Sequence, residues 1–501
     1  MTGATGPLAD GQVVDAIGAD ARAAGYTVEG VADLLGPDAD AALTKGALWP
    51  AIRATGNADP ARLRLAVLVN LFLLGRDETV DRVTAALPSV GVDALTANGV
   101  VEPAAQGQLR AVLDIRPHGD DTRDYLVVSD RDTGGPAGSV RHDYVLGIGG
   151  AALSLARAVV RTPVARALDL GVGSGVQSLH LATHADEVVA TDTNPRALAV
   201  AAATARLNGM SWDLRLGSLF EPVAGERFDL IVSNPPFVVG AGSQDYLYRD
   251  SGMAGDSLCQ HIIEQIPDHL QPGGTAQIMA NWMVRPGQDW RQRVGGWLAG
   301  NGLDAWVVQR EFADPVSYVS LWLADAGESA ERAIERGAQW LDWFDQEGIA
   351  GVGMGTICLR ASGGRTEHVL EEITGAGEEL TGPEVDAFFA RRRYLREHSD
   401  DHLLAARLST APVFLEQHSL PGPDGWQQVG AVVRRPGGPG ATISVDEVFT
   451  ALLAGCRGEV ALGTLIELLA AVHGVDAGAL AQAAMPVIRE AIGRGILHQA
   501  N

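Results

Sequence analysis

Residues 167–175 read Ala-Leu-Asp-Leu-Gly-Val-Gly-Ser-Gly, and they indicate the fold more strongly than any other stretch. An apolar run, predicted as the strand Ala165–Leu170, passes into three glycines at alternate positions and then into a predicted helix. Glycine permits a tight strand-to-helix turn and lets a ligand approach the backbone closely. The stretch therefore predicts a ligand-binding turn at the carboxyl end of a buried strand.

Strands and helices alternate from about residue 163 to 361, which indicates a mostly parallel sheet covered on both faces. The predicted strands are Ala165–Leu170, Glu187–Thr191, Trp212–Leu216, Phe228–Ser233, Thr275–Ala280, Ala305–Phe312 and Gly353–Arg360. The fold class is therefore α/β.

Two carboxylates near the glycines indicate which ligand the turn binds. A Gly-x-Gly-x-Gly run also occurs in dinucleotide-binding folds, or as a plain tight turn. Asp192 closes the second strand, where a carboxylate can accept hydrogen bonds from both hydroxyls of a ribose. Asp169 precedes the glycines and would repel a pyrophosphate, whereas a cofactor with a sulfonium cation and an amino group suits it. The charges favour S-adenosylmethionine over NAD.

A second motif, Asn234-Pro235-Pro236-Phe237, follows the strand Phe228–Ser233. The two prolines fix φ and remove two N–H donors, so this backbone offers only carbonyl acceptors. Asn234 adds an amide oxygen and Phe237 adds a flat ring. Such a site suits a planar group that bears an –NH2, although the tetrapeptide alone could also be a rigid strand-end turn.

In this order and spacing, the motifs resemble those of class I S-adenosylmethionine-dependent methyltransferases over roughly residues 140–310. The similarity is closest to amino-group methyltransferases with an Asn-Pro-Pro-aromatic motif. Residues 233–239 and 249–256 resemble the release-factor glutamine methyltransferases, and the ribosomal RNA N2-guanine and N6-adenine enzymes come second. Ser218 departs from the pattern, because the family often has Asp there as a partner for the adenine amino group.

The resemblance implies S-adenosylmethionine as cofactor, S-adenosylhomocysteine as product and no metal. The expected cofactor-binding residues are Asp169, Gly171, Gly173, Gly175, Asp192, Thr193, Ser218, Leu219 and Asn234. The expected catalytic residues are Asn234, Pro235 and Phe237, and the expected substrate-binding residues are Pro236, Tyr246 and Tyr248. Asn234 and the Pro235 carbonyl would accept the two hydrogens of the substrate –NH2, while Phe237 stacks on its plane.

The function that follows is N-methylation of a planar amino or amide nitrogen, with glutamine in a protein favoured over an RNA base. The same motifs would also suit a small-molecule N-methyltransferase or a non-catalytic cofactor-binding scaffold. The expected partner is thus a protein or RNA substrate, and no association with a membrane is expected.

Mostly helical segments flank the α/β region on both sides. The predicted domains are a winged-helix-like domain at 1–110, a Rossmann-like methyltransferase domain at 111–372 and a mostly helical domain at 373–501. The middle domain has its core at 140–361 and a helical insertion at 314–347. Residues 1–110 carry 8 Lys/Arg against 13 Asp/Glu, which favours packing or peptide contact over DNA binding. The C-terminal helices resemble the N-terminal module in their apolar patterning.

Three clusters outside the motifs have two interpretations each. The aromatic residues of the insertion could form core or a wall of the substrate cleft; they are Tyr318, Trp322, Trp340, Trp343 and Phe344. His180 and His184 have metal-ligand spacing but no third ligand, so packed or solvent-facing histidines are favoured. The arginines at 391–396 could be a solvated helix face or a contact for RNA or an acidic partner.

The composition of the 501-residue chain is that of a globular protein, 46% hydrophobic and 20% charged. The formal net charge of −24 does not favour broad binding to a phosphate backbone. Cys259, Cys358 and Cys456 are far apart, which predicts reduced thiols and a cytoplasmic protein. No signal peptide is expected from the first residues, and the longest apolar run is too short to span a bilayer.

Overall fold

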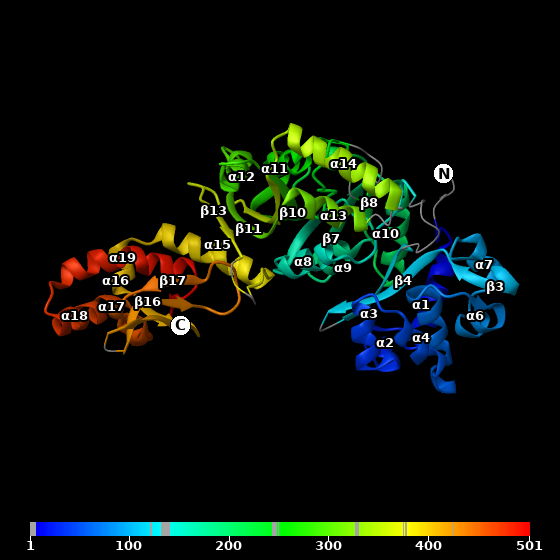
Figure 1. The fold of residues 1–501 in the computed structure, drawn as a ribbon, viewed down its shortest axis with the longest axis horizontal. Helices are drawn as coiled ribbons and strands as arrows, with labels where there is room; N and C mark the ends of the chain where they lie inside the picture. The colour runs from blue at the N-terminus through cyan, green and yellow to red at the C-terminus, as the bar shows by residue number, and fades with distance from the viewer. Residues whose placement is uncertain are drawn as a thin grey trace. The chain divides into compact units, whose positions relative to one another are not determined.

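The computed structural model describes residues 7–120, 123–131, 141–242, 248, 250–325, 330–373, 375, 378–423 and 425–500. The chain divides into two compact units. The first contains residues 1–156, 162–301 and 312–354, and the second contains residues 157–161, 302–311 and 355–501. Figure 1 labels the elements of both.

The first unit begins with a helical module whose helices are α1 (Gly11–Ala23), α2 (Val28–Leu35), α3 (Pro37–Thr44), α4 (Trp49–Gly56), α5 (Leu63–Leu68), α6 (Val80–Ala86) and α7 (Val92–Ala97). The side chains of Asp10, Thr27 and Thr79 cap α1, α2 and α6. A small antiparallel sheet has the order β1 (Glu78–Thr79), β3 (Gln108–Ala111), β2 (Val101–Pro103). Helices α5, α6 and α7 with this sheet have the strand and helix order of a winged helix, as predicted.

The apolar helix α5 continues into a π-helical turn, Val69–Leu73. Asn70, buried within that turn, donates a hydrogen bond to Glu78 (2.7 Å) and accepts one from Thr55 (2.8 Å). Pairing these groups offsets the cost of burying them. Before α5, Asp59 makes no side-chain cap and Pro60 opens a 3-10 turn, Pro60–Arg62.

A hairpin of β4 (Leu113–Asp120) and β5 (Arg123–Asp130) follows, and α8 (Gly150–Ala158) precedes the central sheet. Two bonds from Arg131 join the end of β5 to the N-terminal module, since its Nη1 donates to the carbonyls of Leu71 and Phe72, both at 3.0 Å. Helix α1 also packs on α10 (Pro195–Leu207), where Arg206 forms an ion pair with Asp15 at 2.6 Å. The N-terminal module, the β4–β5 hairpin and α10 thus share one apolar core.

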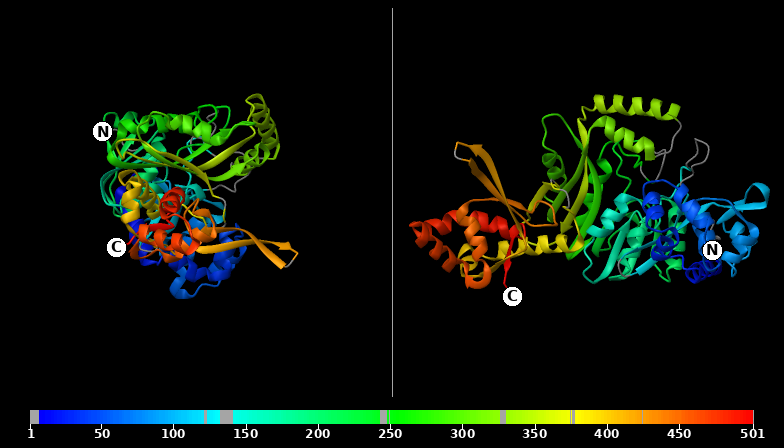
Figure 2. Two further views of the ribbon diagram at one scale, coloured as in Figure 1. Left: turned by 90° about the vertical axis from the view of Figure 1, so that its left-hand side faces the viewer. Right: turned by 60° about the horizontal axis from the view of Figure 1, so that its bottom comes forward.

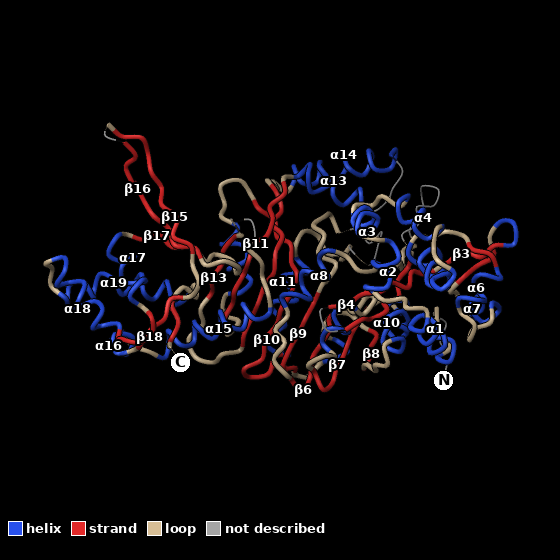
Figure 3. Tube along the Cα trace, turned by 90° about the horizontal axis from the view of Figure 1, so that it is seen from below, coloured by secondary structure: helices blue, strands red, loops and turns tan. Residues whose placement is uncertain are grey.

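The central strands of the first unit lie in the order β10-β9-β6-β7-β8, and every neighbouring pair is parallel (Figure 3). Their bounds are β6 (Val164–Leu170), β7 (Ala185–Asp192), β8 (Asp213–Leu216), β9 (Phe228–Ser233) and β10 (Leu270–Val284). The connecting and covering helices are α9 (Val176–Leu181), α10 (Pro195–Leu207), α11 (Ser257–His269) and α12 (Trp290–Leu298). Parallel pairing brings the carboxyl ends of β6, β7, β8 and β9 to one edge, where ligands bind in such sheets.

Helices α13 (Pro315–Asp325) and α14 (Ala330–Gln346) pack against each other as a helical hairpin (Figure 2). Tyr318, Val319 and Phe344 are buried in an apolar cluster with Val238 and Val239. Part of the aromatic stripe is therefore core, in agreement with the first of its two interpretations. The strand β12 (Gly351–Arg360) follows.

The second unit pairs β11 (Asp304–Ala313) in parallel with β13 (His368–Glu372). Its helices are α15 (Gly382–Glu397), α16 (Asp400–Ala405), α17 (Glu447–Gly455), α18 (Leu462–His473) and α19 (Ala477–Gly493). One sheet has the order β18 (Arg457–Ala461), β14 (Arg407–Thr410), β19 (Leu497–Gln499), and a second joins β15 (Phe414–Gly422), β16 (Gly425–Arg434) and β17 (Thr442–Val445). The β15–β16 hairpin extends away from these helices (Figure 2).

The arginine run on α15 proves to be structural. Arg391 pairs with Glu384 (2.7 Å), Arg392 pairs with Glu367 (2.9 Å), and Arg396 pairs with the buried Asp304 (2.7 Å). The pairs of Arg392 and Arg396 join α15 to other segments of its unit, and Arg391, whose ion pair lies within α15, also donates from Nε to the carbonyl of Gly493 at 3.1 Å. Arg393, the remaining arginine of the run, is exposed, so the interpretation as a solvated face fits that residue.

Candidate functional site

The glycine turn joins β6 to α9. Gly171, Gly173 and Gly175 all have positive φ, of 85°, 52° and 86°. In addition, a Cβ on Gly175 would stand 2.7 Å from the ring of Trp212. Residues with side chains adopt these angles only with strain, so the turn requires glycine and leaves its backbone bare.

Asp192, at the end of β7, ties the turn to the next helix. Its carboxylate accepts hydrogen bonds from the N–H of Gly173 (3.0 Å) and the N–H of Asn194 (2.8 Å). Burial raises the pKa of Asp192, and the hydrogen bonds from Asn194, Gly173 and Thr193 oppose the rise. The carboxylate is thus fixed beside the glycine backbone.

Asp169, in β6, lies 1% exposed behind the turn. Its Oδ2 accepts a 2.6 Å hydrogen bond from Ser178, while its Oδ1 has no hydrogen-bond partner among the described residues. Burial raises the pKa of Asp169 to about 7, against the lowering effect of the Ser178 hydrogen bonds. Burial therefore destabilises the ionised form of Asp169, and a nearby cation would stabilise that form.

This cost predicts how stability depends on pH. The folded-state pKa of Asp169 is raised, so the folded protein holds a proton that the unfolded chain releases near pH 3.8, and stability falls as pH rises from about 4 to 7. Asp169→Asn removes that slope. Between pH 5.5 and pH 8 the advantage of Asp169→Asn over wild type should grow by roughly 2 kcal/mol in urea denaturation. Comparing two pH values cancels the cost of burying the new amide, and an advantage independent of pH would contradict the assignment.

The end of β8 supplies two further residues at the same edge, Ser218 and Leu219. Leu219 has a positive φ of 48°, uncommon for a residue with a side chain. Such conformations cluster at ligand sites.

Asn234 to Phe237 follow β9. Ser233 donates a 2.7 Å hydrogen bond to the carbonyl of Leu170, which joins this strand end to the glycine turn. Oδ1 of Asn234 is buried and has no hydrogen-bond partner among the described residues. The ring of Phe237 meets Trp322 of α13 edge to face, with centroids 6.1 Å apart.

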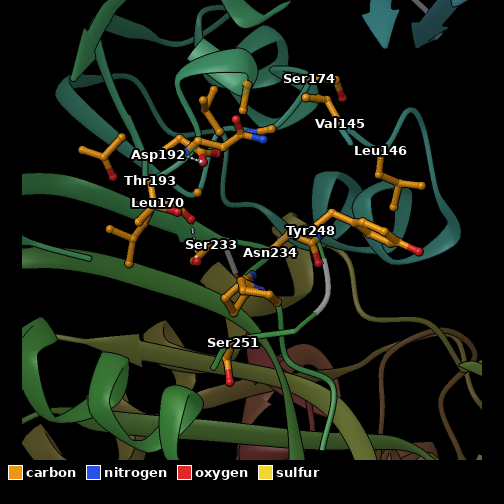
Figure 4. A pocket seen from close by; sticks show the side chains of 18 of the residues that line it. Val145, Leu146, Leu170, Ser174, Asp192, Thr193, Ser233, Asn234, Tyr248 and Ser251 are labelled. Atoms are coloured by element: carbon orange, nitrogen blue, oxygen red, sulfur yellow. Dashed lines mark hydrogen bonds between the residues drawn. The ribbon is translucent and has the colours of Figure 1, made fainter. Parts of the chain in front are cut away.

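These strand ends enclose a cavity of about 540 Å³. Of the residues predicted for the site, it is lined by Gly171, Gly173, Asp192, Thr193, Ser218, Leu219, Asn234, Pro235, Pro236 and Tyr248. Figure 4 shows Asn234 close to Tyr248, with Asp192 and Thr193 at the end of β7, which β6 separates from β9. Asp169, Gly175 and Phe237 do not line it. Tyr246 lies outside the described residues.

Two wall segments of the cavity were not predicted from the sequence. One is the stretch before α8, including Tyr144, Val145 and Leu146, and the other is residues 250–253. Tyr144 packs edge to face on Tyr248, with centroids 5.4 Å apart. The sequence at 143–150 is rich in glycine and contains a tyrosine, which is compatible with a ligand-binding loop. Only the structure shows that this stretch lines the cavity.

His180 lies in α9, but His184 lies in the turn between α9 and β7, so the two histidines are not on one helix as their spacing predicted. His180 shares a 2.9 Å hydrogen bond, Nε2 to Nε2, with His118 of β4, while Nδ1 of His184 lies 3.1 Å from the hydroxyl of Thr183. His180 is therefore a packed histidine. Among the described residues, no three His, Cys, Asp or Glu side chains are grouped as metal ligands, and none of the described helices is long and apolar enough to cross a membrane.

Comparison with known families gives three matches along the chain. Residues 149–288 match the family described as methyltransferase small domain. Residues 23–112 and 386–499 match two families described only as domains of unknown function.

Curated relatives match the same kind of region. A release factor glutamine methyltransferase of Geobacter sulfurreducens is 40% identical over 135 residues, which cover 24% of this chain and 47% of the relative. A ribosomal RNA small subunit methyltransferase C of Alcanivorax borkumensis is 30% identical over 116 residues, covering 23% of this chain and 32% of the relative. The chain thus spans about half or less of the length of these relatives.

Among solved structures, the ribosomal protein L11 methylase of Lactobacillus delbrueckii subsp. bulgaricus is 27% identical, with a TM-score of 0.22. The match covers 31% of this chain and 67% of that one. The family match and the curated relatives confirm the predicted resemblance to class I methyltransferases. Residues 149–288 thus match a methyltransferase small domain, within a chain that carries a mostly helical module on either side.

Proposed function

We propose that this protein is an S-adenosylmethionine-dependent N-methyltransferase that acts on a planar amino or amide nitrogen, with glutamine in a protein as the favoured acceptor. One observation carries the proposal: Oδ1 of Asn234 is buried without a hydrogen-bond partner among the described residues, at the wall of the large cavity. A buried amide oxygen in that state costs free energy unless a ligand donates to it. An –NH2 group is such a donor.

The residues at the cavity fit the cofactor. The bare glycine backbone would admit its amino-acid end, the Asp192 carboxylate could accept hydrogen bonds from the ribose hydroxyls, and Ser218, which lines the same cavity, would contact the adenine. Asp169, with its raised pKa, favours a ligand whose amino end and sulfonium are cationic. When bound, S-adenosylmethionine supplies an electrophilic methyl group and leaves as S-adenosylhomocysteine.

The chain's own residues would orient the nucleophile. An amide nitrogen is a poor nucleophile because its lone pair is delocalised. Asn234 Oδ1 and the Pro235 carbonyl would accept the two –NH2 hydrogens and so direct the lone pair at the methyl carbon. Phe237 does not line the cavity, so its edge-to-face contact with Trp322 would instead hold the segment that carries Asn234 and Pro235. Positioning of this kind can contribute on the order of 7–11 kcal/mol, and the proton lost after transfer can go to water without a strong base.

Protein is favoured over RNA as the substrate because the chain is strongly acidic, with a formal net charge of −24. The relatives are compatible with both substrate classes, protein and RNA, since they are named glutamine methyltransferases and ribosomal RNA methyltransferases. RNA base methylation is therefore the second candidate. A small-molecule acceptor, or a scaffold that binds the cofactor without transferring its methyl group, would use the same cavity. The three buried free cysteines suit a cytoplasmic enzyme.

Methyl-labelled cofactor and a cell extract test the proposal. The purified full-length protein should transfer label into the extract, and the labelled material should be lost on protease treatment but survive nuclease. If nuclease removes the label and protease does not, the methyl acceptor is an RNA base and not glutamine. No cofactor binding by calorimetry would overturn the enzyme assignment itself.

A further inference from the structure

A second cavity, of about 160 Å³, adjoins the first beneath helix α14. Asp250, Ser251 and Met253 line both cavities, so these residues form the wall between them. Ser251 is labelled at the lower edge of Figure 4, away from Asp192. The second cavity therefore lies alongside the part of the site that would hold the substrate.

The helical hairpin that roofs this cavity also holds the Asn-Pro-Pro-Phe segment. The N–H of Val239 donates to the hydroxyl of Tyr318 (2.9 Å), and the carbonyl of Val239 accepts from Nε1 of Trp340 (3.0 Å). Trp322 contacts Phe237. Aromatic side chains of α13 and α14 thus fix the backbone that follows the motif. Both helices lie outside residues 149–288, the methyltransferase match.

We propose that the second cavity is the subsite for one side chain of a polypeptide substrate, next to the glutamine that is methylated. This inference rests on the proposed function and deepens it. Trp340, Val238 and Met253 give the cavity apolar lining. Arg336 and Gln339 line it from α14; a guanidinium has several N–H donors that suit peptide carbonyls, and the Gln339 amide also donates to Glu335 (3.4 Å). Gly240 and Gly242 also line the cavity, and the carbonyl of Gly240 accepts a 2.8 Å hydrogen bond from the N–H of Gly255.

Size and charge favour a peptide over RNA. A cavity near 150 Å³ accommodates a group about the size of benzene, which matches one side chain and is too small for a nucleotide. Helix α14 carries four acidic residues against two arginines over Ala330–Gln346, so it would not attract a phosphate backbone.

Two variants test the subsite in the full-length protein. Arg336→Ala removes a donor, and Gly240→Leu adds a bulky side chain at the cavity lining, where the three nearest neighbours of an added Cβ are atoms of the Trp340 ring at 3.5–3.7 Å. Arg332→Ala, one turn away on α14 and outside the cavity, is the matched control. The probe is the protein fraction of a nuclease-treated cell extract, titrated with methyl-labelled cofactor.

Arg336→Ala should raise the extract concentration for half-maximal labelling roughly tenfold, with the maximal rate nearly retained. Gly240→Leu should abolish labelling, while Arg332→Ala matches wild type and all three variants bind S-adenosylmethionine as wild type does. If Gly240→Leu misfolds and loses cofactor binding, the result for Arg336→Ala still tests the subsite. Wild-type labelling by Arg336→Ala, or transfer to RNA alone, would overturn the subsite but leave the enzyme. Failure of wild type to bind cofactor would instead overturn the proposed function.

Discussion

Replacing Asn234 by alanine is expected to lower the rate of methyl transfer by at least about a hundredfold, the usual loss when one preorganised hydrogen-bonding group is removed from a catalytic site. The alanine cannot accept a hydrogen from the substrate –NH2, so the lone pair is no longer aimed at the methyl group. The maximal rate should carry most of the loss. Single-turnover transfer of labelled methyl into the extract measures it.

Two comparisons make that result specific. Asn234→Asp keeps an acceptor oxygen and should retain more activity than Asn234→Ala. Asn57→Ala, an exposed asparagine after α4, should have no effect. Transfer at the wild-type rate by Asn234→Ala would show that the amide oxygen does not orient the nucleophile.

Asp192→Ala should weaken binding of S-adenosylmethionine by at least about a hundredfold. Two hydrogen bonds from ribose hydroxyls to a carboxylate contribute about 1.5–3 kcal/mol each, and the glycine turn also loses its contact from Gly173 to this carboxylate. Isothermal titration calorimetry on the full-length protein measures the change.

The matched control is Asp186→Ala, because Asp186 lies in the same strand at the opposite end and is exposed. Its affinity for the cofactor should equal that of wild type. Equal affinity of Asp192→Ala and wild type would remove Asp192 from the cofactor site and weaken the ribose interpretation.

The local features of the central sheet could be predicted because neighbours in sequence produce them. An apolar run followed by alternating glycines has few conformations other than a buried strand and a tight turn, and β6 ends at Leu170 as expected. The ends of other elements were predicted less closely. β8 begins at Asp213, one residue later than predicted, because Trp212 packs against the glycine turn instead. β10 runs from Leu270 to Val284, well beyond the predicted Thr275–Ala280.

Contacts between distant segments could not be predicted in the same way. Phe237 meets Trp322 across 85 residues, Arg396 pairs with Asp304 across 92, and His180 shares a hydrogen bond with His118 across 62. Each pairing depends on how helices and strands pack, which no local pattern specifies. The partners of the arginine run and of the histidine pair therefore became known only from the structure.

The α/β sheet, the glycine turn and the acceptors at two strand ends follow from the amino-acid sequence alone, because periodicity and backbone restriction act over a few residues. The folded chain was needed to show that these strand ends meet in one cavity with residues 144–149 and 250–253, and that Asp169 lies behind its wall. It was needed as well to show that α14 lines a second cavity beside the first. Burial, pKa and cavity shape depend on every segment that packs around a residue, and most of those segments are far away in the chain.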